Sequence, residues 1–121
     1  DALLQRGIRI HVVHFIAMEM NGSAARNREL LWVDYKLFFE KAKPIIRRLI
    51  HHGIDVGLYD FPLCAVEPAY WPLAKQSITG WKVRYPEGCA QCDEKAACGG
   101  IFRSTALLGL CPVYPIKYKE K

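Results

Sequence analysis

The chain has 121 residues, of which 51% are hydrophobic, and a formal net charge of +5. This length is typical of one domain, and the composition suffices for a core of its own or for part of a larger one. No run of about 18 apolar residues occurs, so the sequence predicts neither a membrane span nor a signal peptide, and it favours a cytoplasmic protein. The basic excess lies mainly in "KAKPIIRR" and the tail "KYKEK" rather than in one patch interleaved with aromatics, which disfavours nucleic-acid binding.

The first ten residues, "DALLQRGIRI", resemble the end of a helix followed by the start of a strand, and the first of them is Asp1. We therefore expect the chain to begin inside a larger protein. Residues 8–18 are rich in Ile, Val and Phe with little alternation. This pattern is typical of a strand buried on both faces, and it predicts a central strand of a parallel sheet.

The next segment, "NGSAARN", predicts a turn in which Ser23 caps a short helical turn. A helix is then indicated within residues 30–53, where apolar residues recur with helical spacing and Gly53 is placed to end it. We expect Pro44 to kink this helix or to mark a second start. The periodic apolar positions are 38, 42, 45, 46, 49 and 50.

A second strand is predicted at "IDVGLYDF", residues 54–61. Strand, helix and strand in this order indicate a right-handed parallel crossover unit, so the fold class is α/β. After Pro62 the periodicity is lost, although "EPAYWPLAKQS" can form a short helix. We therefore divide the chain into an α/β part, residues 1–63, and a cysteine-rich part with a tail, residues 64–121.

Three of the five cysteines lie within "CAQCDEKAACGG", residues 89–100. Cys89 and Cys92 form a C-x2-C pair, a spacing that lets two thiolates face one metal from a tight turn, and Cys98 follows after five residues. Cys64 lies upstream and Cys111 downstream. A segment without sheet or helix periodicity needs such a staple to hold it in place.

Three chemistries compete for these cysteines. Structural disulfides are disfavoured by the odd number of cysteines and by the absence of a secretory signal. A structural zinc site usually pairs two short C-x2-C or C-x2-H turns, whereas this sequence has one such turn. Iron–sulfur clusters are reached from well-separated loops and are mostly held by cysteine alone, so we favour an iron–sulfur site and keep zinc as the alternative.

The order of "CAQC", five residues and "CGG" resembles the core of the auxiliary-cluster (SPASM/twitch-like) domains that follow the barrel in many radical S-adenosylmethionine (radical SAM) peptide-modifying enzymes. Cys64, followed after fifteen residues by Gly80, is similar to the first half of that pattern. Tyr85 stands where the pattern has a further cysteine. The resemblance therefore leaves ligands for one cluster at most.

A narrower resemblance is to the C-terminal part of the C-type radical SAM maturases of His-Xaa-Ser systems. It covers residues 14–118, and its segments occur in the order of that family. The segments are "MEMNGSAARNRELLWVD", "LYDFPLC", "WPLAKQSITGWKVRY", "CAQCDEKAACGGIF" and "VYPIKY". Within the first of them, the arrangement of Glu19, Gly22, Ala24 and Asn27 matches the family.

The resemblance implies that the strands are late strands of a partial (β/α) barrel and that the cysteine segment closes its end. It also implies radical chemistry on a peptide, with His-Xaa-Ser repeats in the substrate and a partner maturase as candidate partners. The complete enzyme would use S-adenosylmethionine and a [4Fe–4S] cluster bound by C-x3-C-x2-C, a motif absent from these 121 residues. We therefore assign no catalytic residue to this chain and expect it to be inactive alone.

The resemblance also suggests ligands. Glu19 and Asn27 would bind S-adenosylmethionine or the peptide, although both residues could instead satisfy the turn after the first strand. Four cysteines are expected to hold an auxiliary [4Fe–4S] cluster: Cys64, Cys89, Cys92 and Cys98. Cys111 competes with Cys64 for the fourth position because it precedes a proline, as a cluster ligand of bacterial ferredoxins does. Four cations are candidates for balancing the charge of the cluster: Lys82, Arg84, Lys95 and Arg103.

Overall fold

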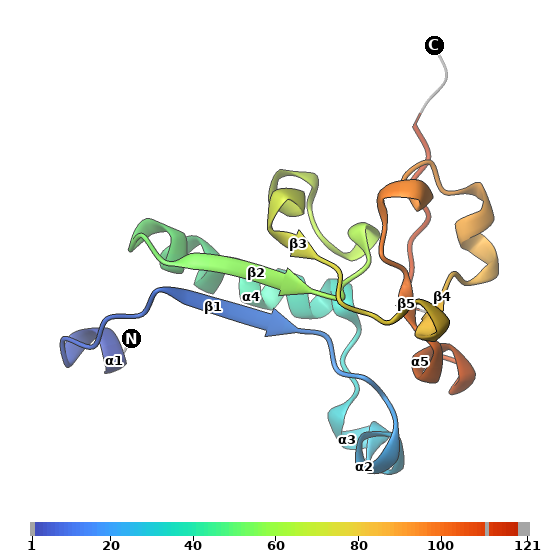
Figure 1. Ribbon diagram of the computed structural model, residues 1–121, viewed down its shortest axis with the longest axis horizontal. Helices are drawn as coiled ribbons and strands as arrows, with labels where there is room; N and C mark the ends of the chain where they lie inside the picture. Colours follow the sequence, from blue (N-terminus) through green and yellow to red (C-terminus); the bar gives the residue numbers. More distant parts are fainter. Residues whose placement is uncertain (1, 111, 119–121) are drawn as a thin grey trace.

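A computed structural model describes residues 2–110 and 112–118. The chain forms a small parallel sheet flanked by helices (Figure 1). A region of short 3-10 turns follows, together with a pair of strands of two residues each. The elements of the α/β part are α1 (Ala2–Gln5), β1 (Val12–Ile16), α2 (Gly22–Arg26), α3 (Arg28–Leu31), α4 (Tyr35–His51) and β2 (Asp55–Tyr59). The later elements are η1 (Leu63–Ala65), η2 (Pro68–Leu73), β3 (Ala74–Lys75), η3 (Gly80–Lys82), β4 (Val83–Arg84), η4 (Glu87–Gln91), η5 (Lys95–Ala97), β5 (Ile101–Phe102) and α5 (Arg103–Leu107).

The first sheet has the order β1-β2-β3, and all of its pairs are parallel. Val12 pairs with Asp55 and Ile16 with Tyr59, so β1 and β2 are in register along their full length. The predicted strand–helix–strand unit with parallel strands is therefore confirmed, and the protein is mixed α/β. The second sheet is the antiparallel pair β4 and β5.

The prediction that the first strand is central and buried on both faces was wrong. β1 lies at the edge of the sheet formed by the described residues, and β2 is the central strand. On one face of β1, Phe15 packs edge-on against Phe38 of α4. The other face carries Val12 and Ile16, which are 47% and 66% exposed. A continuous apolar run indicates burial on both faces only where both faces are covered.

The long helix α4 begins where the side chain of Asp34 accepts hydrogen bonds from the backbone N–H groups of Lys36 and Leu37. This N-cap separates α4 from α3, whereas the sequence pattern had predicted one helix from residue 30. Pro44 lies inside α4, which continues through it to His51. Gly53 has a φ of +76° and follows the helix, as predicted.

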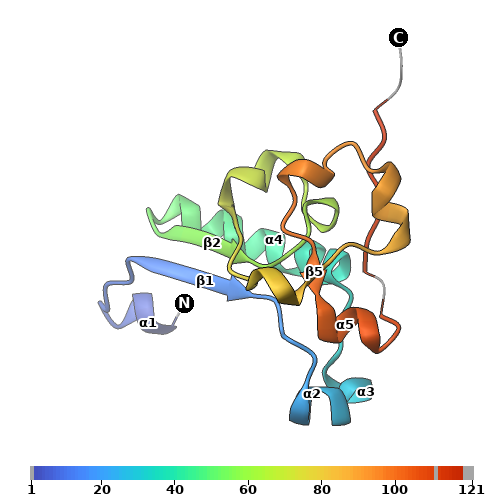
Figure 2. The same cartoon turned by 45° about the vertical axis from the view of Figure 1, so that its right-hand side comes forward.

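Two smaller expectations concern the segments around α2 and η2. Ser23 lies within α2, whose N-cap residue is Asn21, so the prediction that Ser23 caps this turn was wrong. The short helix expected after Glu67 is the 3-10 helix η2. Figures 1 and 2 show α2 and α3 projecting beyond the carboxyl end of β1, away from the sheet.

One core joins the α/β part to the cysteine-rich part. The side chains of Ile46 in α4, Leu58 in β2 and Ile101 in β5 are each at most 1% exposed and belong to the same cluster. The buried face of α4 consists of Tyr35, Phe39, Ala42 and Ile46. The cysteine-rich region is therefore fixed to the sheet by apolar packing as well as by its own polar contacts. In the described part of the chain, no helix has the length and apolar character needed to cross a membrane.

Neighbouring isoleucines of α4 test this packing. Ile46→Ala removes a fully buried side chain, and we expect it to lower the free energy of unfolding by about 2–5 kcal/mol because it leaves a cavity. Ile45→Ala is the matched control, since Ile45 is 55% exposed and should change stability by no more than about 0.5 kcal/mol. Urea denaturation measures both values. Equal losses would contradict the orientation of α4.

Candidate metal centre

Four cysteines from two segments of the chain line one cavity of about 20 Å³, namely Cys64, Cys89, Cys92 and Cys98. Cys64 lies in η1, five residues after β2 ends, whereas the other three lie in and around η4 and η5. Cys64, Cys92 and Cys98 form no disulfide. The structure thus brings together all four cysteines that the sequence pattern grouped.

Local hydrogen bonds fix the position of Cys64 in the turn that follows β2. The indole N–H of Trp71 donates to the carbonyl oxygens of Leu63 and Val66, at 3.0 and 2.9 Å, and so closes the turn around Cys64. Upstream of this turn, Pro62 is fully buried. A thiol at the end of a paired strand therefore has its position fixed before any metal binds.

The three cysteines of the second segment are placed by tight turns. The N–H of Cys92 donates to the carbonyl oxygen of Cys89 at 3.0 Å, which folds the C-x2-C pair into one turn. The N–H of Cys98 donates to the carbonyl oxygen of Lys95 at 3.2 Å. The spacing of the motif thus produces two consecutive 3-10 turns, each ending at a cysteine.

Four backbone N–H groups donate to the sulfur atoms. Cys98 Sγ accepts from Leu63 and Gly100, both at 3.4 Å. Cys64 Sγ accepts from Tyr114 at 3.1 Å, and Cys92 Sγ accepts from Ile116 at 3.3 Å. Such donors stabilise a thiolate relative to a thiol, and they are a normal feature of the surroundings of cluster sulfurs.

Gly100 shows why this segment carries the sequence "CGG". Its φ is +75°, and a Cβ atom at this position would lie 2.8 Å from the carbonyl oxygen of Arg84. Only glycine combines this backbone conformation with the close approach of the neighbouring strand. The N–H that points at Cys98 Sγ therefore depends on a glycine at position 100.

Burial, with a smaller contribution from the neighbouring sulfurs of Cys98, Cys89 and Cys92, raises the pKa of the Cys64 thiol to about 11, while the N–H of Tyr114 acts in the opposite direction. These electrostatic effects reach Cys64 from all three other cysteines. The thiol must therefore lose its proton when a metal binds, and negative charge gathered in the cavity needs a cation to compensate it.

The size of the cavity bears on what the sulfurs can hold. Its volume is close to that required by one water molecule, so the four cysteines surround space rather than touch at a common point. Within residues 2–110 and 112–118, no three His, Cys, Asp or Glu side chains form a group that could hold a metal ion as they stand.

The C-terminal segment supplies part of this site. The N–H of Asp93 donates to the carbonyl oxygen of Ile116 at 2.8 Å, and the N–H of Tyr118 donates to Asp93 Oδ2 at 2.7 Å. Figures 1 and 2 show this segment running beside the turns that carry the cysteines. The sequence carries no signal for this contribution of the tail. Cys111, the rival fourth ligand, lies outside the described residues.

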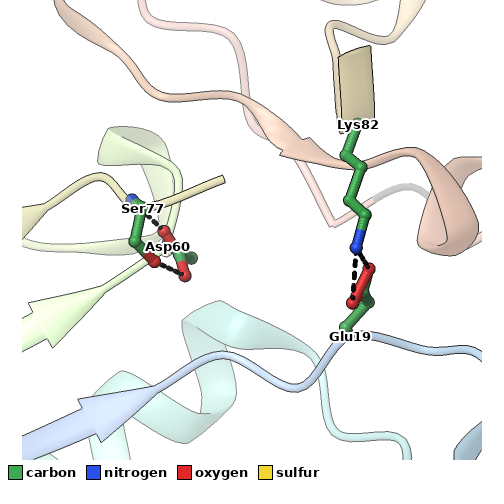
Figure 3. Close-up of polar contacts among 4 residues, drawn as sticks. All are labelled: Glu19, Asp60, Ser77 and Lys82. Atoms are coloured by element: carbon green, nitrogen blue, oxygen red, sulfur yellow. Dashed lines mark hydrogen bonds and ion pairs between the residues drawn. The ribbon is translucent and has the colours of Figure 1, made fainter. Parts of the chain in front are cut away.

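The two residues expected to bind S-adenosylmethionine or peptide are engaged elsewhere. The carboxylate of Glu19 forms an ion pair with Lys82 Nζ at 2.9 Å, which links the end of β1 to η3 (Figure 3). Asn27 Nδ2 donates to the carbonyl oxygen of Ser23 at 2.8 Å, at the junction of α2 and α3. Neither residue lines the cysteine cavity.

A third polar feature occurs at the carboxyl end of β2. Asp60 is 5% exposed and has a φ of +68°, and its two carboxylate oxygens accept hydrogen bonds from the N–H and the hydroxyl of Ser77, both at 2.6 Å (Figure 3). Asp60 falls within the predicted second strand, residues 54–61, whereas the sequence carries no signal for Ser77. The pair fixes the loop after β3 against the end of β2.

Comparisons with models of known protein families, with curated protein sequences and with solved structures found no match. Function is therefore inferred from the residues and the geometry described above.

The raised pKa of Cys64 predicts slow alkylation in the metal-free protein. Because less thiolate is present at a given pH, the rate with iodoacetamide should rise with pH through a midpoint near 11. Mass spectrometry of the labelled peptide at a series of pH values measures this midpoint. A midpoint near the ordinary thiol value of 9 would show that the cysteine is not buried as described.

Proposed function

We propose that this chain is the C-terminal portion of a radical S-adenosylmethionine peptide maturase and that it binds an auxiliary [4Fe–4S] cluster. In this proposal the parallel unit of β1, α4 and β2 is part of a partial (β/α) barrel, and the cysteine-rich region closes the end of that barrel. The ligands are Cys64, Cys89, Cys92 and Cys98, and the protein acts in the cytoplasm.

The observation that carries this proposal is the convergence of these four cysteines on one cavity. Cys64 reaches the cavity from the turn after β2, and the three cysteines of the C-x2-C-x5-C segment reach it from a later part of the chain. Cluster ligands are commonly gathered from separate loops, and cysteine is their usual type. The motif order and the spatial arrangement both support these four residues as the ligands.

The sequence pattern favours a cluster over zinc. It has one C-x2-C turn, where zinc sites usually pair two, and cluster ligands are commonly gathered from separate loops. A zinc-stapled protein-binding module is the competing function. The backbone N–H groups directed at Cys64, Cys92 and Cys98 add to the preference, because they offset the negative charge of thiolates.

When bound, an auxiliary cluster supplies one-electron chemistry. The cysteines of this chain would hold it at the carboxyl edge of the strands, where the reactive centre of a parallel (β/α) barrel lies. The buried side chains around Leu63 and Val113 limit access of water to the sulfurs. The chain thereby positions an electron relay, or an ordered end of the peptide site, beside the radical chemistry of the complete enzyme.

Glu19 and Asn27 have a conditional place in this proposal. Glu19 follows β1 at the same edge of the sheet, and its carboxylate is held by Lys82 rather than directed at the cysteines. For Glu19 to bind S-adenosylmethionine or a peptide amine, its ion pair with Lys82 would have to open, or the carboxylate would have to contact Lys82 and the ligand together. The peptide substrate, with His-Xaa-Ser repeats as one candidate, and a partner maturase belong to the complete enzyme.

Anaerobic reconstitution tests the cluster. We expect about four irons per chain and a broad visible absorbance, because four cysteine thiolates match one [4Fe–4S] cluster. The control is a variant in which Cys89 and Cys92 are both serine, which removes the C-x2-C turn. Stoichiometric zinc uptake by the parent chain without any iron would establish the competing zinc module instead.

Single substitutions identify the fourth ligand. Cys64→Ser should lose the cluster or leave one exchangeable iron, because Cys64 lines the cavity. Cys111→Ser is the matched control and should keep about four irons and an unchanged spectrum. Iron analysis and absorbance spectra compare the two variants. Bleaching by Cys111→Ser alone would make Cys64 an ordinary buried thiol.

The chain alone should not cleave S-adenosylmethionine. Reductive cleavage needs an open iron of a cluster held by three cysteines, and the C-x3-C-x2-C motif for it is absent from this sequence. The measurement is 5′-deoxyadenosine formation by the reconstituted chain with a strong reductant, against a control with iron and sulfide only. Formation above that control would contradict the assignment of this chain to the auxiliary part.

A further inference from the structure

Cations near the cysteine segment have different partners. Lys82 is paired with Glu19, and Arg84 Nη1 donates to the carbonyl oxygens of Trp81 and Val83. Lys95 is different because it lines the cysteine cavity itself. Among the four cations that the sequence offered for charge balance, Lys95 is the one that the structure places on the cavity wall.

The backbone of Lys95 connects two of the proposed ligands. Its N–H donates to the carbonyl oxygen of Cys92 at 3.4 Å, and its carbonyl oxygen accepts from the N–H of Cys98 at 3.2 Å. Movement of Lys95 relative to the sulfurs is therefore limited by the turn η5 and by both cysteines. The backbone of Lys95 thus has a defined place in the site, and its exposed side chain extends from there.

The side chain of Lys95 is also held. Its Nζ lies 5.2 Å from the ring centroid of Tyr85, within the range of a cation–π interaction. Tyr85 lines the same cavity, and its hydroxyl donates to the carbonyl oxygen of Cys98 at 2.7 Å. Tyr85, which stands where the family pattern has a further cysteine, thus holds the ammonium group beside a ring that lines the cavity.

The nearby acids do not take Lys95 as their partner. Glu94 also lines the cavity, and its Oε1 accepts a hydrogen bond from the hydroxyl of Tyr118. Asp93 accepts from the N–H of Tyr118 and has Lys117 Nζ at 3.8 Å. Among the described ion pairs, none joins Lys95 to a carboxylate. The ammonium charge is therefore available to act on the sulfurs.

We propose that Lys95, positioned by Tyr85, sets the reduction potential of the cluster held by these cysteines. This inference rests on the proposed function. A cluster held by four thiolates gains one further negative charge when it is reduced. A fixed cation on the cavity wall stabilises the reduced form more than the oxidised form, and so raises the potential. Lys95 is a positioning and tuning residue and not a ligand.

The experiment is a spectroelectrochemical titration of the reconstituted chain and its variants, after the iron content of each has been measured. Lys95→Gln should shift the midpoint potential to a more negative value, and Lys95→Glu should shift it about twice as far in the same direction, because the charge changes by two. Lys95→Arg keeps the charge and should stay close to the parent. Arg84→Gln is the control for loss of a charge that does not line the cavity.

The outcomes separate this inference from the proposed function. If the parent chain takes up no iron, the proposed function fails. If all variants carry about four irons and share one potential, the role of Lys95 is overturned while the cluster stands. Equal shifts for Lys95→Gln and Arg84→Gln would also overturn it. Should Lys95→Gln lose iron, acetyl-lysine incorporated at position 95 removes the charge but keeps the aliphatic stem over Tyr85, and the same negative shift is expected.

Discussion

The whole cysteine-rich region depends on one constraint, which is that half-buried sulfur atoms from two distant segments must share a small space. The loss of water raises the pKa of Cys64, and repulsion between the sulfurs adds to this effect. Backbone N–H donors offset part of the cost. The cubane proposed for this space would supply the larger, positive compensation that turns four mutually repelling groups into ligands.

Parts of this arrangement follow from the sequence, because their causes are local. Apolar periodicity located α4 and the parallel pair β1–β2, and the spacing of Cys89, Cys92 and Cys98 indicated a turn that presents thiols on one side. The edge position of β1 could not be inferred in the same way. An apolar run reports which residues avoid water, but it does not report how many neighbours the strand has.

The missed parts of the site come from contacts between segments far apart in the chain. The amides of Tyr114 and Ile116 point at sulfurs, and every residue type except proline carries such an amide, so the sequence contains no sign of them. The same holds for Ser77, whose ordinary serine side chain becomes a partner of Asp60 only after β3 has paired with β2. Glu19 and Lys82 likewise meet across 63 positions. Residue types limit what a site can hold, whereas tertiary packing decides which of them meet.

The proline between Tyr114 and Ile116 adds a consequence for the tail. Pro115 has no N–H, so between Tyr114 and Ile116, whose N–H groups both donate to sulfurs, the backbone carries no donor that needs another partner. Its ring lies close to Gly88, where a Cβ atom would be 3.0 Å from Pro115 Cγ. Proline also restricts the unfolded tail to extended conformations, so less chain entropy is lost when the segment docks. The tail is therefore already close to its bound conformation before it packs against the cavity, and docking costs less conformational entropy.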